Sequence, residues 1–183
     1  MGWFSHEELL FRTMERAIVQ NRLDAGFEDV DDFMNFSLSV QNRRKSRAGY
    51  ALENHLERIL SMREVAYSRG KATEGRSTTD FVFPGIAEYK DPKFPTEGLT
   101  MLGVKSTCKD RWRQVLAEAK RVSEKHLLTL EPSISLSQTE EMRSHFLRLV
   151  LPTALHGSYL PEQQEWLMSV HDFVSMVSAR QTA

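Results

Sequence analysis

The sequence predicts an α/β fold, in which a mixed central β-sheet is flanked by helices and preceded by an N-terminal helical segment. In the first third of the chain, apolar residues recur at helical intervals. Short apolar or β-branched runs then follow, separated by glycine, proline or charged residues. Stretches with helical spacing lie between these runs, as expected when helices pack on the faces of a sheet.

Three helices are expected before the first strand. Ser5 and Glu8 have the spacing of a capping box, and the helix that they begin is expected over residues 6–22. Apolar side chains favour a second helix over Val30–Val40, and helical spacing resumes at Ser46 for a third. This part of the chain is therefore expected to be helical throughout.

Five segments are expected to form strands because they are short, apolar or β-branched, and bounded by turn residues. They are Glu64–Ser68, Thr78–Phe83, Thr100–Thr107, Leu127–Leu130 and Leu147–Leu151. Between the third and fourth of these, residues 110–123 are expected to form a helix, since Trp112 and Val115 are spaced to face inward. Further helices are expected near residues 138–146 and 171–177.

Length and composition predict a single domain over residues 1–183, because 40% hydrophobic residues can supply one sizeable core. The lone Cys108 excludes an internal disulfide, and no apolar stretch is long enough for a membrane span or a secretion signal. No histidine or cysteine spacing favours zinc. We therefore expect a soluble, cytoplasmic protein with no membrane partner.

Charge is segregated along the chain, although the formal net charge is only −1. Residues 1–34 are mainly acidic, whereas basic residues dominate residues 43–76 and 105–121. Such segregation can create a cationic face on a protein of nearly zero net charge. A nucleic acid could bind to such a face.

Three side chains that are far apart in the sequence form the minimum set for hydrolysing a phosphodiester with a divalent cation. Asp80 lies in the second expected strand, Lys105 in the third, and Glu118 in the helix that follows. If these strands are neighbours, the Asp80 carboxylate and the Lys105 ammonium meet at one end of the sheet. Mg²⁺ prefers carboxylate, carbonyl and water oxygens, which Asp80, Glu118 and the Val104 carbonyl would supply. Lys105 would hold or deprotonate the attacking water.

A structural interpretation competes with the catalytic one. Taken singly, an aspartate at a strand end is usually a turn residue, and a lysine or a helical glutamate is usually solvated. For Glu53, a place in a salt-bridge network with Glu57, Arg58 and their neighbours is favoured over catalysis. The alternative from a different class is a DNA-binding module that does not catalyse a reaction.

The catalytic set is embedded in a recognisable sequence. Asp80, the block Lys-Ser-Thr-Cys-Lys-Asp-Arg-Trp-Arg-Gln at 105–114, and Glu118 together resemble the restriction-endonuclease branch of the PD-(D/E)xK superfamily. They resemble the family of EcoRII catalytic (C-terminal) domains most closely. The resemblance implies a restriction-endonuclease-like core over residues 43–183, and it leaves residues 1–42 as a helical arm for dimerisation.

The resemblance implies a role for each residue of the set. Asp80 is implied to be the metal-binding acid, Lys105 the catalytic lysine, and Glu118 an acid displaced onto the following helix. Tyr89 and Lys109 are implied to be supporting catalytic residues.

The chain departs from the superfamily pattern at two positions. Gly103 stands two residues before the lysine, where an acid is usual, and Thr79 stands before Asp80, where a proline is usual. In this branch the missing carboxylate is thought to have moved to the downstream helix. The assignment therefore depends on Glu118.

The same resemblance assigns sequence reading to Lys109, Asp110 and Arg111, with Arg113 contacting phosphate or base. Arginine can donate two hydrogen bonds to guanine, and a carboxylate can accept one from cytosine N4. The alternative interpretation is a charged first helical turn with Asp110 at its N-terminal end. Four further basic residues are expected to contact the DNA backbone: Arg43, Arg44, Lys45 and Arg47.

The target implied by the resemblance is the DNA duplex CCWGG, W being A or T, cut on the 5′ side of the first cytosine. Related enzymes flip the central pair, and an extruded base needs an aromatic or guanidinium surface to stack on. The candidates for that contact are Trp3, Phe4, Arg12, Arg47 and Tyr50. A structure-specific or repair nuclease with the same metal site is the alternative within this fold.

A pseudopalindromic target has two scissile phosphates related by a dyad. Two active sites related in the same way are therefore needed, which implies a homodimer with the N-terminal helices as interface. The resemblance also implies that a full-length protein could carry an N-terminal effector domain.

Overall fold

The computed structural model describes residues 2–75, 77–108 and 111–182, with side chains from His6 onward. The chain forms two compact units, residues 1–51 and residues 52–183. None of the described helices is long and apolar enough to cross a membrane.

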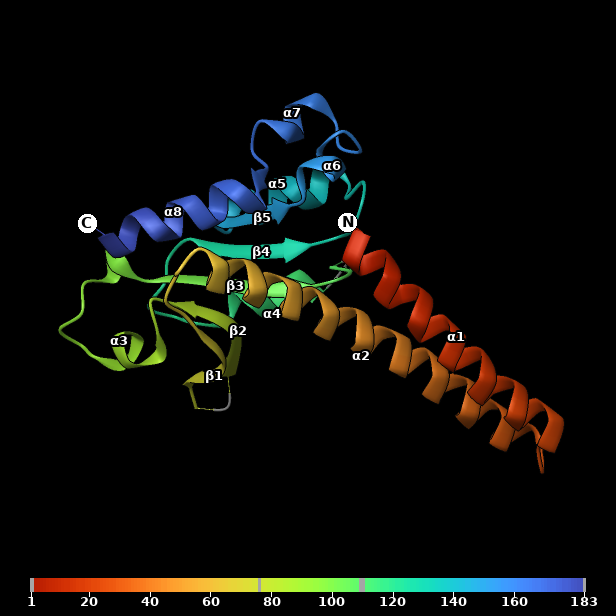
Figure 1. Ribbon diagram of the computed structural model, residues 1–183. Helices are drawn as coiled ribbons and strands as arrows, with labels where there is room; N and C mark the ends of the chain where they lie inside the picture. Colours follow the sequence, from red (N-terminus) through yellow and green to blue (C-terminus); the bar gives the residue numbers. More distant parts are fainter. Residues whose placement is uncertain (1, 76, 109–110, 183) are drawn as a thin grey trace. The chain divides into compact units, whose positions relative to one another are not determined.

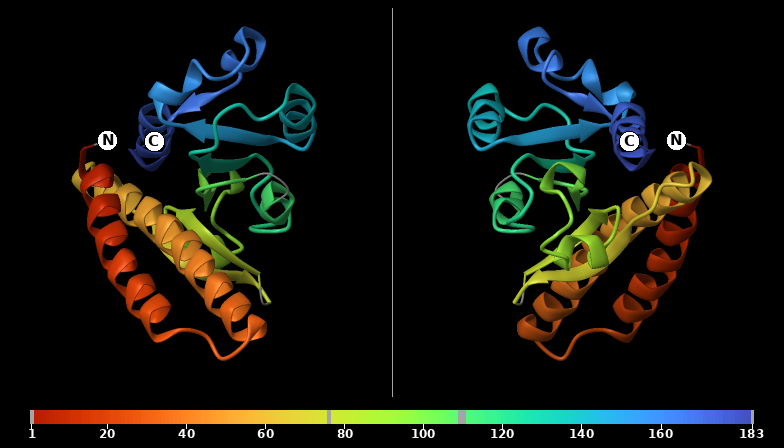
Figure 2. Two further views of the ribbon diagram at one scale, coloured as in Figure 1. Left: turned by 90° about the vertical axis from the view of Figure 1, so that its right-hand side faces the viewer. Right: turned by 90° about the vertical axis from the view of Figure 1, so that its left-hand side faces the viewer.

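The first unit is a pair of antiparallel helices (Figures 1 and 2). Helix α1 spans Gly2–Ala25, and Gly26, with φ +79, ends it by donating its amide to the Arg22 carbonyl at 3.1 Å. Helix α2 begins at Val30, where the Asp29 side chain accepts a hydrogen bond from the Asp32 amide at 2.8 Å. That contact is the N-terminal capping that aspartate favours.

Helix α2 continues without a break over Val30–Met62, so the two separate helices expected in this region were wrong. Residues 41–45 are Gln-Asn-Arg-Arg-Lys, which include neither glycine nor proline. Glutamine, arginine and lysine are good helix formers, and nothing in this stretch breaks the helix. The boundary between the two units falls inside this helix.

The second unit contains a six-stranded sheet with the strands in sequence order. Its strands are β1 (Ser68–Glu74), β2 (Ser77–Phe83), β3 (Thr100–Lys105), β4 (Lys125–Thr129), β5 (Leu147–Leu151) and β6 (Met168–Ser169). Strands β1, β2 and β3 pair in antiparallel fashion, and β3 to β6 pair in parallel. This confirms the mixed sheet that the sequence predicts (Figure 1).

The first strand lies later in the chain than expected, at Ser68–Glu74 instead of Glu64–Ser68. It is the edge strand, and its residues Ser-Arg-Gly-Lys-Ala-Thr-Glu contain no apolar face. Charged edge strands are common because they discourage pairing with other chains. Hydrophobic periodicity therefore could not locate this strand.

The helices of the second unit are mostly short. They are α3 (Ile86–Lys90), the 3₁₀ helix η1 (Thr96–Gly98), α4 (Trp112–Leu116), α5 (Leu136–Ser144), α6 (Thr153–His156), α7 (Pro161–Gln164) and α8 (Val170–Thr182). The sequence analysis missed α3, η1, α6, α7 and β6, since elements of two to five residues carry no periodic signal.

Helix α4 is much shorter than the helix expected over residues 110–123. It ends at Leu116, and Ala119 takes a positive φ of 45°. Glu118 therefore lies in a turn beyond the helix and not on it, which corrects the position expected for this residue.

Two apolar clusters cover opposite faces of the sheet, because successive side chains of a strand alternate between its faces. Met101 and Leu127 belong to the cluster that contains Trp112 and Val115 of α4. The other cluster includes Leu102, Leu128, three leucines from the end of α2 (52, 56 and 60) and three residues of α8 (Phe173, Val174 and Val177). By the same alternation, Asp80, Gly103 and Lys105 belong to the face on which α4 packs.

Candidate active site

Asp80 and Lys105 form a direct ion pair where β2 and β3 lie side by side. The Lys105 ammonium donates to Asp80 Oδ2 at 2.6 Å, and the Val104 backbone amide donates to the same oxygen at 2.6 Å. The two side chains are 23% (Asp80) and 12% (Lys105) exposed, so the pair is partly shielded from water. The two strands are antiparallel neighbours, which is the condition under which the sequence predicts this meeting.

Glu118 belongs to the same electrostatic cluster. The pKa of Glu118 is raised to about 7, mainly by burial; the Lys105 ammonium opposes this rise, and the negative charge of Asp80 contributes to it. Glu118 is 9% exposed, and its Oε2 has no hydrogen-bond partner among the described residues. A buried carboxylate oxygen without a partner is costly, and such groups concentrate at functional sites.

Gly103 leaves no room for an acidic side chain two residues before Lys105. A Cβ atom at this position would come within 2.9 Å of Val115 Cγ2, and Val115 is fully buried in α4. A carboxylate at residue 103 would therefore collide with the helix. The glycine lets α4 pack directly on β3, and the turn beyond α4 then carries Glu118 towards Asp80.

The donor set fits a hard divalent cation. Two carboxylates and a backbone carbonyl, completed by water, are ligands that Mg²⁺ accepts. No group of three or more acidic, histidine or cysteine side chains with metal-binding geometry occurs within residues 2–75, 77–108 and 111–182. The predicted metal-binding set contains only two acidic side chains, those of Asp80 and Glu118.

Tyr89 belongs to a neighbouring network. Its hydroxyl donates to the Glu74 carboxylate and accepts from the Arg121 amide at 3.2 Å. Burial raises the pKa of Tyr89 to about 12, and the hydrogen bond to Glu74 adds to this effect. Its described hydrogen bonds therefore lead to Glu74 and Arg121, not to the Asp80–Lys105 pair.

Sequence reasoning missed Glu74, Arg121 and Lys125, which surround the turn that carries Glu118. The Lys125 ammonium donates to the backbone carbonyls of Glu118, Ala119 and Val122 at 2.5, 3.0 and 3.0 Å. No spacing in the sequence signals these contacts, because they join segments that are distant in the chain or involve backbone atoms.

The residues predicted to read DNA are described only in part. Lys109 and Asp110 lie outside the described residues, while Arg111 is exposed just before α4. Arg113 pairs with both carboxylate oxygens of Glu141 at 2.8 Å. An Arg113 contact to DNA would replace this exposed ion pair.

Two of the four residues that are predicted to contact the DNA backbone already pair with acidic side chains inside the first unit. Arg44 pairs with Glu15 through two nitrogens, and its guanidinium holds the pKa of Glu15 below its usual value. Arg47 pairs with Glu8. Arg43 and Lys45 are exposed on α2.

The stacking candidates also differ in how they are placed. Arg12 pairs with Glu8 at 2.7 Å, and Tyr50 is 64% exposed. The side chains of Trp3 and Phe4 lie outside the described part of the chain.

Glu53 takes part in an ion-pair network, as the structural interpretation expects. The Arg69 guanidinium donates to Glu53 at 2.9 Å and to Glu57 at 2.6 Å. The basic partner is therefore Arg69 of β1, whereas the sequence suggested Arg58.

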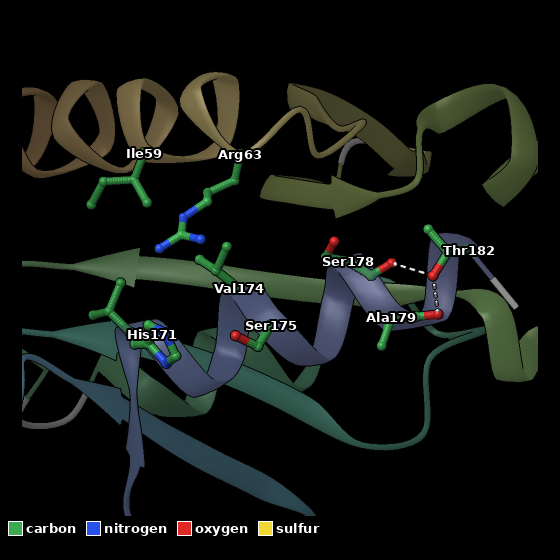
Figure 3. A pocket seen from close by; sticks show the side chains of 9 residues that line it. Ile59, Arg63, His171, Val174, Ser175, Ser178, Ala179 and Thr182 are labelled. Carbon is green, nitrogen blue, oxygen red and sulfur yellow. Dashed lines mark hydrogen bonds between the residues drawn. The ribbon is translucent and has the colours of Figure 1, made fainter.

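A groove of about 540 Å³ lies on the α8 side of the second unit (Figure 3). Ile59 and Arg63 line it from α2, and residues from Val170 to Thr182 line it from α8. The Thr182 hydroxyl in its wall donates within α8, to the Ser178 and Ala179 carbonyls. Among the predicted site residues that the structure describes, none lines this groove.

Comparison with known proteins adds independent findings. The family model described as EcoRII C terminal matches residues 11–174. The chain is 43% identical over 167 residues to the type II restriction enzyme EcoRII of Escherichia coli. That match covers 91% of this chain and 41% of the relative, so the chain spans about two fifths of the relative's length.

Two similar solved structures are complexes of metal-depleted Ecl18kI with uncleaved DNA, which in one of them is modified. Their TM-scores are 0.68 for the complex with modified DNA and 0.65 for the other, each at 20% sequence identity. The first similarity covers 98% of this chain and 65% of the Ecl18kI chain, and the second covers 96% and 62%. At this level of identity the similarity confirms the restriction-endonuclease-like fold.

Proposed function

This chain belongs to the EcoRII C-terminal family, and from that premise we propose that it is a type II restriction endonuclease domain that hydrolyses double-stranded DNA with Mg²⁺. The observation that carries the proposal is the cluster of Asp80, Lys105 and Glu118. The similar proteins support it, since EcoRII is a restriction enzyme and the Ecl18kI structures contain DNA.

Each member of the cluster has a role that its environment suits. Asp80, Glu118 and the Val104 carbonyl would hold the metal ion, which stabilises negative charge on the phosphate oxygens when bound. Lys105, held at 2.6 Å from Asp80, would orient the attacking water as an ammonium ion, or accept the proton of the water as a neutral amine. Partial burial of the pair strengthens these electrostatic effects relative to those in bulk water.

The proposed target is CCWGG, cut on the 5′ side of the first cytosine. Lys109, Asp110 and Arg111 would read the G·C pairs in the major groove, and Arg113 would add a base or phosphate contact. Support comes from the place of this block in the sequence, between Lys105 of β3 and Trp112, where α4 begins. Arg43, Arg44, Lys45 and Arg47 are proposed to contact the DNA backbone, where Arg44 and Arg47 would exchange acidic partners for phosphates.

We further propose that the protein acts as a homodimer and that a second copy covers the apolar surface of the first unit. Many large apolar side chains are exposed on its two helices, and a protein surface of this kind commonly binds a partner. They are Leu9, Leu10, Met14, Ile18, Leu23, Val30, Phe33, Met34 and Leu38. A second copy would also supply the second active site that a two-strand cut requires.

Cleavage of a duplex with a single CCWGG site in Mg²⁺, followed by sequencing of the ends, tests the function. The proposal predicts one defined cut in each strand. It also predicts that Asp80→Ala loses cleavage by at least about 1,000-fold while DNA binding is retained. Glu140→Ala, which removes an exposed carboxylate on α5, is the matched control and should cleave normally.

Two results would favour the alternatives. Ends scattered along the duplex would indicate a structure-specific or repair nuclease. Binding without any cleavage by the wild-type protein would indicate a DNA-binding module.

A further inference from the structure

The turn that carries Glu118, residues 117–122, is held by side chains from other parts of the second unit. Helix α4 ends at Leu116, so its regular hydrogen bonds do not extend through this segment. Ala119 in the middle of the turn has φ +45, a conformation that non-glycine residues rarely adopt. The Glu118 amide still donates to the Val115 carbonyl of α4 at 3.1 Å, and contacts from outside the turn hold the residues that follow it.

Glu74 and Tyr89 hold one side of the turn. Glu74 Oε1 accepts from the Lys120 amide at 3.0 Å and also from the Tyr89 hydroxyl. The same hydroxyl accepts from the Arg121 amide at 3.2 Å. Two consecutive amides of the turn thus donate to a tyrosine–glutamate pair supplied by β1 and α3.

Lys125 holds the carbonyl side of the same turn. Its ammonium is bonded to the three carbonyls of Glu118, Ala119 and Val122 and is largely buried. Burial lowers the pKa of Lys125, while the negative charges of Glu74 and Glu118 oppose that shift. Glu74, which accepts from the Lys120 amide on one side of the turn, therefore also interacts electrostatically with Lys125 on the other side.

Such contacts matter because a metal ligand must be oriented accurately. Outer-shell partners that orient a ligand affect metal affinity by about 10- to 100-fold when they are removed. One oxygen of the Glu118 carboxylate has no hydrogen-bond partner among the described residues, and Thr79 is the side chain that acts on the carboxylate as a hydrogen-bond donor. The backbone of the turn therefore also decides where the carboxylate stands.

We propose that Glu74, Tyr89 and Lys125 are positioning residues that hold Glu118 against the Asp80–Lys105 pair. In this role the Tyr89 hydroxyl orders the turn and takes no part in the chemical step. This inference rests on the proposed function, because it assumes that Glu118 binds the metal ion.

Tyr89→Phe is the main test, since it removes the hydroxyl and keeps the buried ring. The Mg²⁺ concentration that gives half-maximal single-turnover cleavage should rise by about tenfold, and the rate at saturating Mg²⁺ should change by less than about threefold. Binding of Mn²⁺ to the full chain without DNA, followed by electron paramagnetic resonance, should weaken by a similar factor.

Tyr67→Phe is the matched control. The Tyr67 hydroxyl also donates to a glutamate, Glu57, at 3.0 Å, but this pair does not contact the turn. It should leave the Mg²⁺ requirement and Mn²⁺ affinity unchanged. At Glu74, glutamine keeps an oxygen that accepts hydrogen bonds and should weaken metal binding less than alanine does.

Two outcomes would overturn the inference. In the first, Tyr89→Phe matches Tyr67→Phe in both metal measurements. In the second, Tyr89→Phe slows cleavage by 100-fold or more at saturating Mg²⁺ with unchanged Mn²⁺ affinity, which would make Tyr89 a catalytic residue. Failure of the proposed function is separate, because it would appear as scattered ends or as no cleavage by the wild-type protein. Normal cleavage and Mn²⁺ binding in Glu118→Ala would instead remove Glu118 from the proposed metal site.

Discussion

Glu118 illustrates how the energetic cost of burying a single residue can indicate a candidate site. A buried carboxylate reduces the free energy of unfolding unless partners compensate for its lost hydration. Here Asp80 adds repulsion, and one carboxylate oxygen has no described hydrogen-bond partner. The sequence analysis selected this glutamate through its spacing and a family resemblance, but its buried surroundings could be known only from the structure.

At the residue scale too, the burial of His126 predicts that the stability of the protein depends on pH. It is fully buried in β4, with its ring centroid 5.1 Å from that of Phe173. Burial lowers the pKa of His126 to about 3, and the charges of Arg180 and Arg148 act in the same direction. The unfolded chain therefore binds a proton first as the pH falls. The neutral His126 side chain makes its full contribution to the free energy of unfolding above pH 6.5, and this contribution is lost as the pH falls towards 3.

Replacing His126 with leucine should reduce this loss. Between pH 6 and 4, the free energy of unfolding should fall less steeply in the variant than in the wild type. The two slopes should differ by up to about 1.4 kcal/mol per pH unit. Urea unfolding at several pH values measures the slope. His171→Leu, at an exposed position on α8, is the control. Equal slopes for His126→Leu and the wild type would contradict the prediction.

At the scale of elements, the packing of α4 on β3 decides where the second acid can stand. Gly103 leaves no space for a side chain, since its Cβ would lie 2.9 Å from Val115. The sequence shows that an acid is missing from the usual position. The reason becomes visible only when a strand and a helix that are separated in the chain are seen in contact.

Gly103→Asp tests this packing. The variant should lose about 1–3 kcal/mol of unfolding free energy because the core around Val115 is overpacked. Combined with Glu118→Ala, it should also fail to restore cleavage. Thermal unfolding and the cleavage assay measure the two effects.

Gly157→Ala is the control for this test, because a Cβ at that position meets nothing within 4 Å. It should unfold at nearly the wild-type temperature. Recovery of cleavage in the double variant would show that residue 103 can accommodate a metal ligand.

Local signals located some elements better than others. Strands β2 and β5 are apolar and well bounded, and both occur close to where they were expected. Strand β1 was misplaced because its edge position requires no apolar face, and α2 was divided because a polar stretch was interpreted as a break. Both errors have the same cause: the segment is exposed to solvent and therefore lacks the apolar pattern on which the prediction depends.

At the scale of the whole molecule, the proposed dimer depends on the helices of the first unit. Leu10 and Met14 are 68% and 67% exposed and stand one helical turn apart on α1. The double variant Leu10→Glu/Met14→Glu should shift the protein towards monomer in sedimentation experiments, because two charges would be buried at the interface. Its helical content should stay unchanged.

Leu160→Glu provides the comparison for the dimer prediction, since Leu160 is 51% exposed in the second unit. This variant should sediment as the wild type does. A Leu10→Glu/Met14→Glu protein that still sediments as a dimer would place the interface elsewhere.

By itself the sequence determined the α/β class, the mixed sheet and the family, and it selected Asp80 and Lys105 as a pair on the condition that their strands are neighbours. These follow from hydrophobic spacing, turn residues and a conspicuous block of residues, all of which are local features of the chain. Only the tertiary structure decided that Glu118 stands in a turn held by Glu74, Tyr89 and Lys125, and that Gly103 must lack a side chain. Burial, close packing and charge interactions depend on which distant segments meet, and local patterns do not specify those meetings.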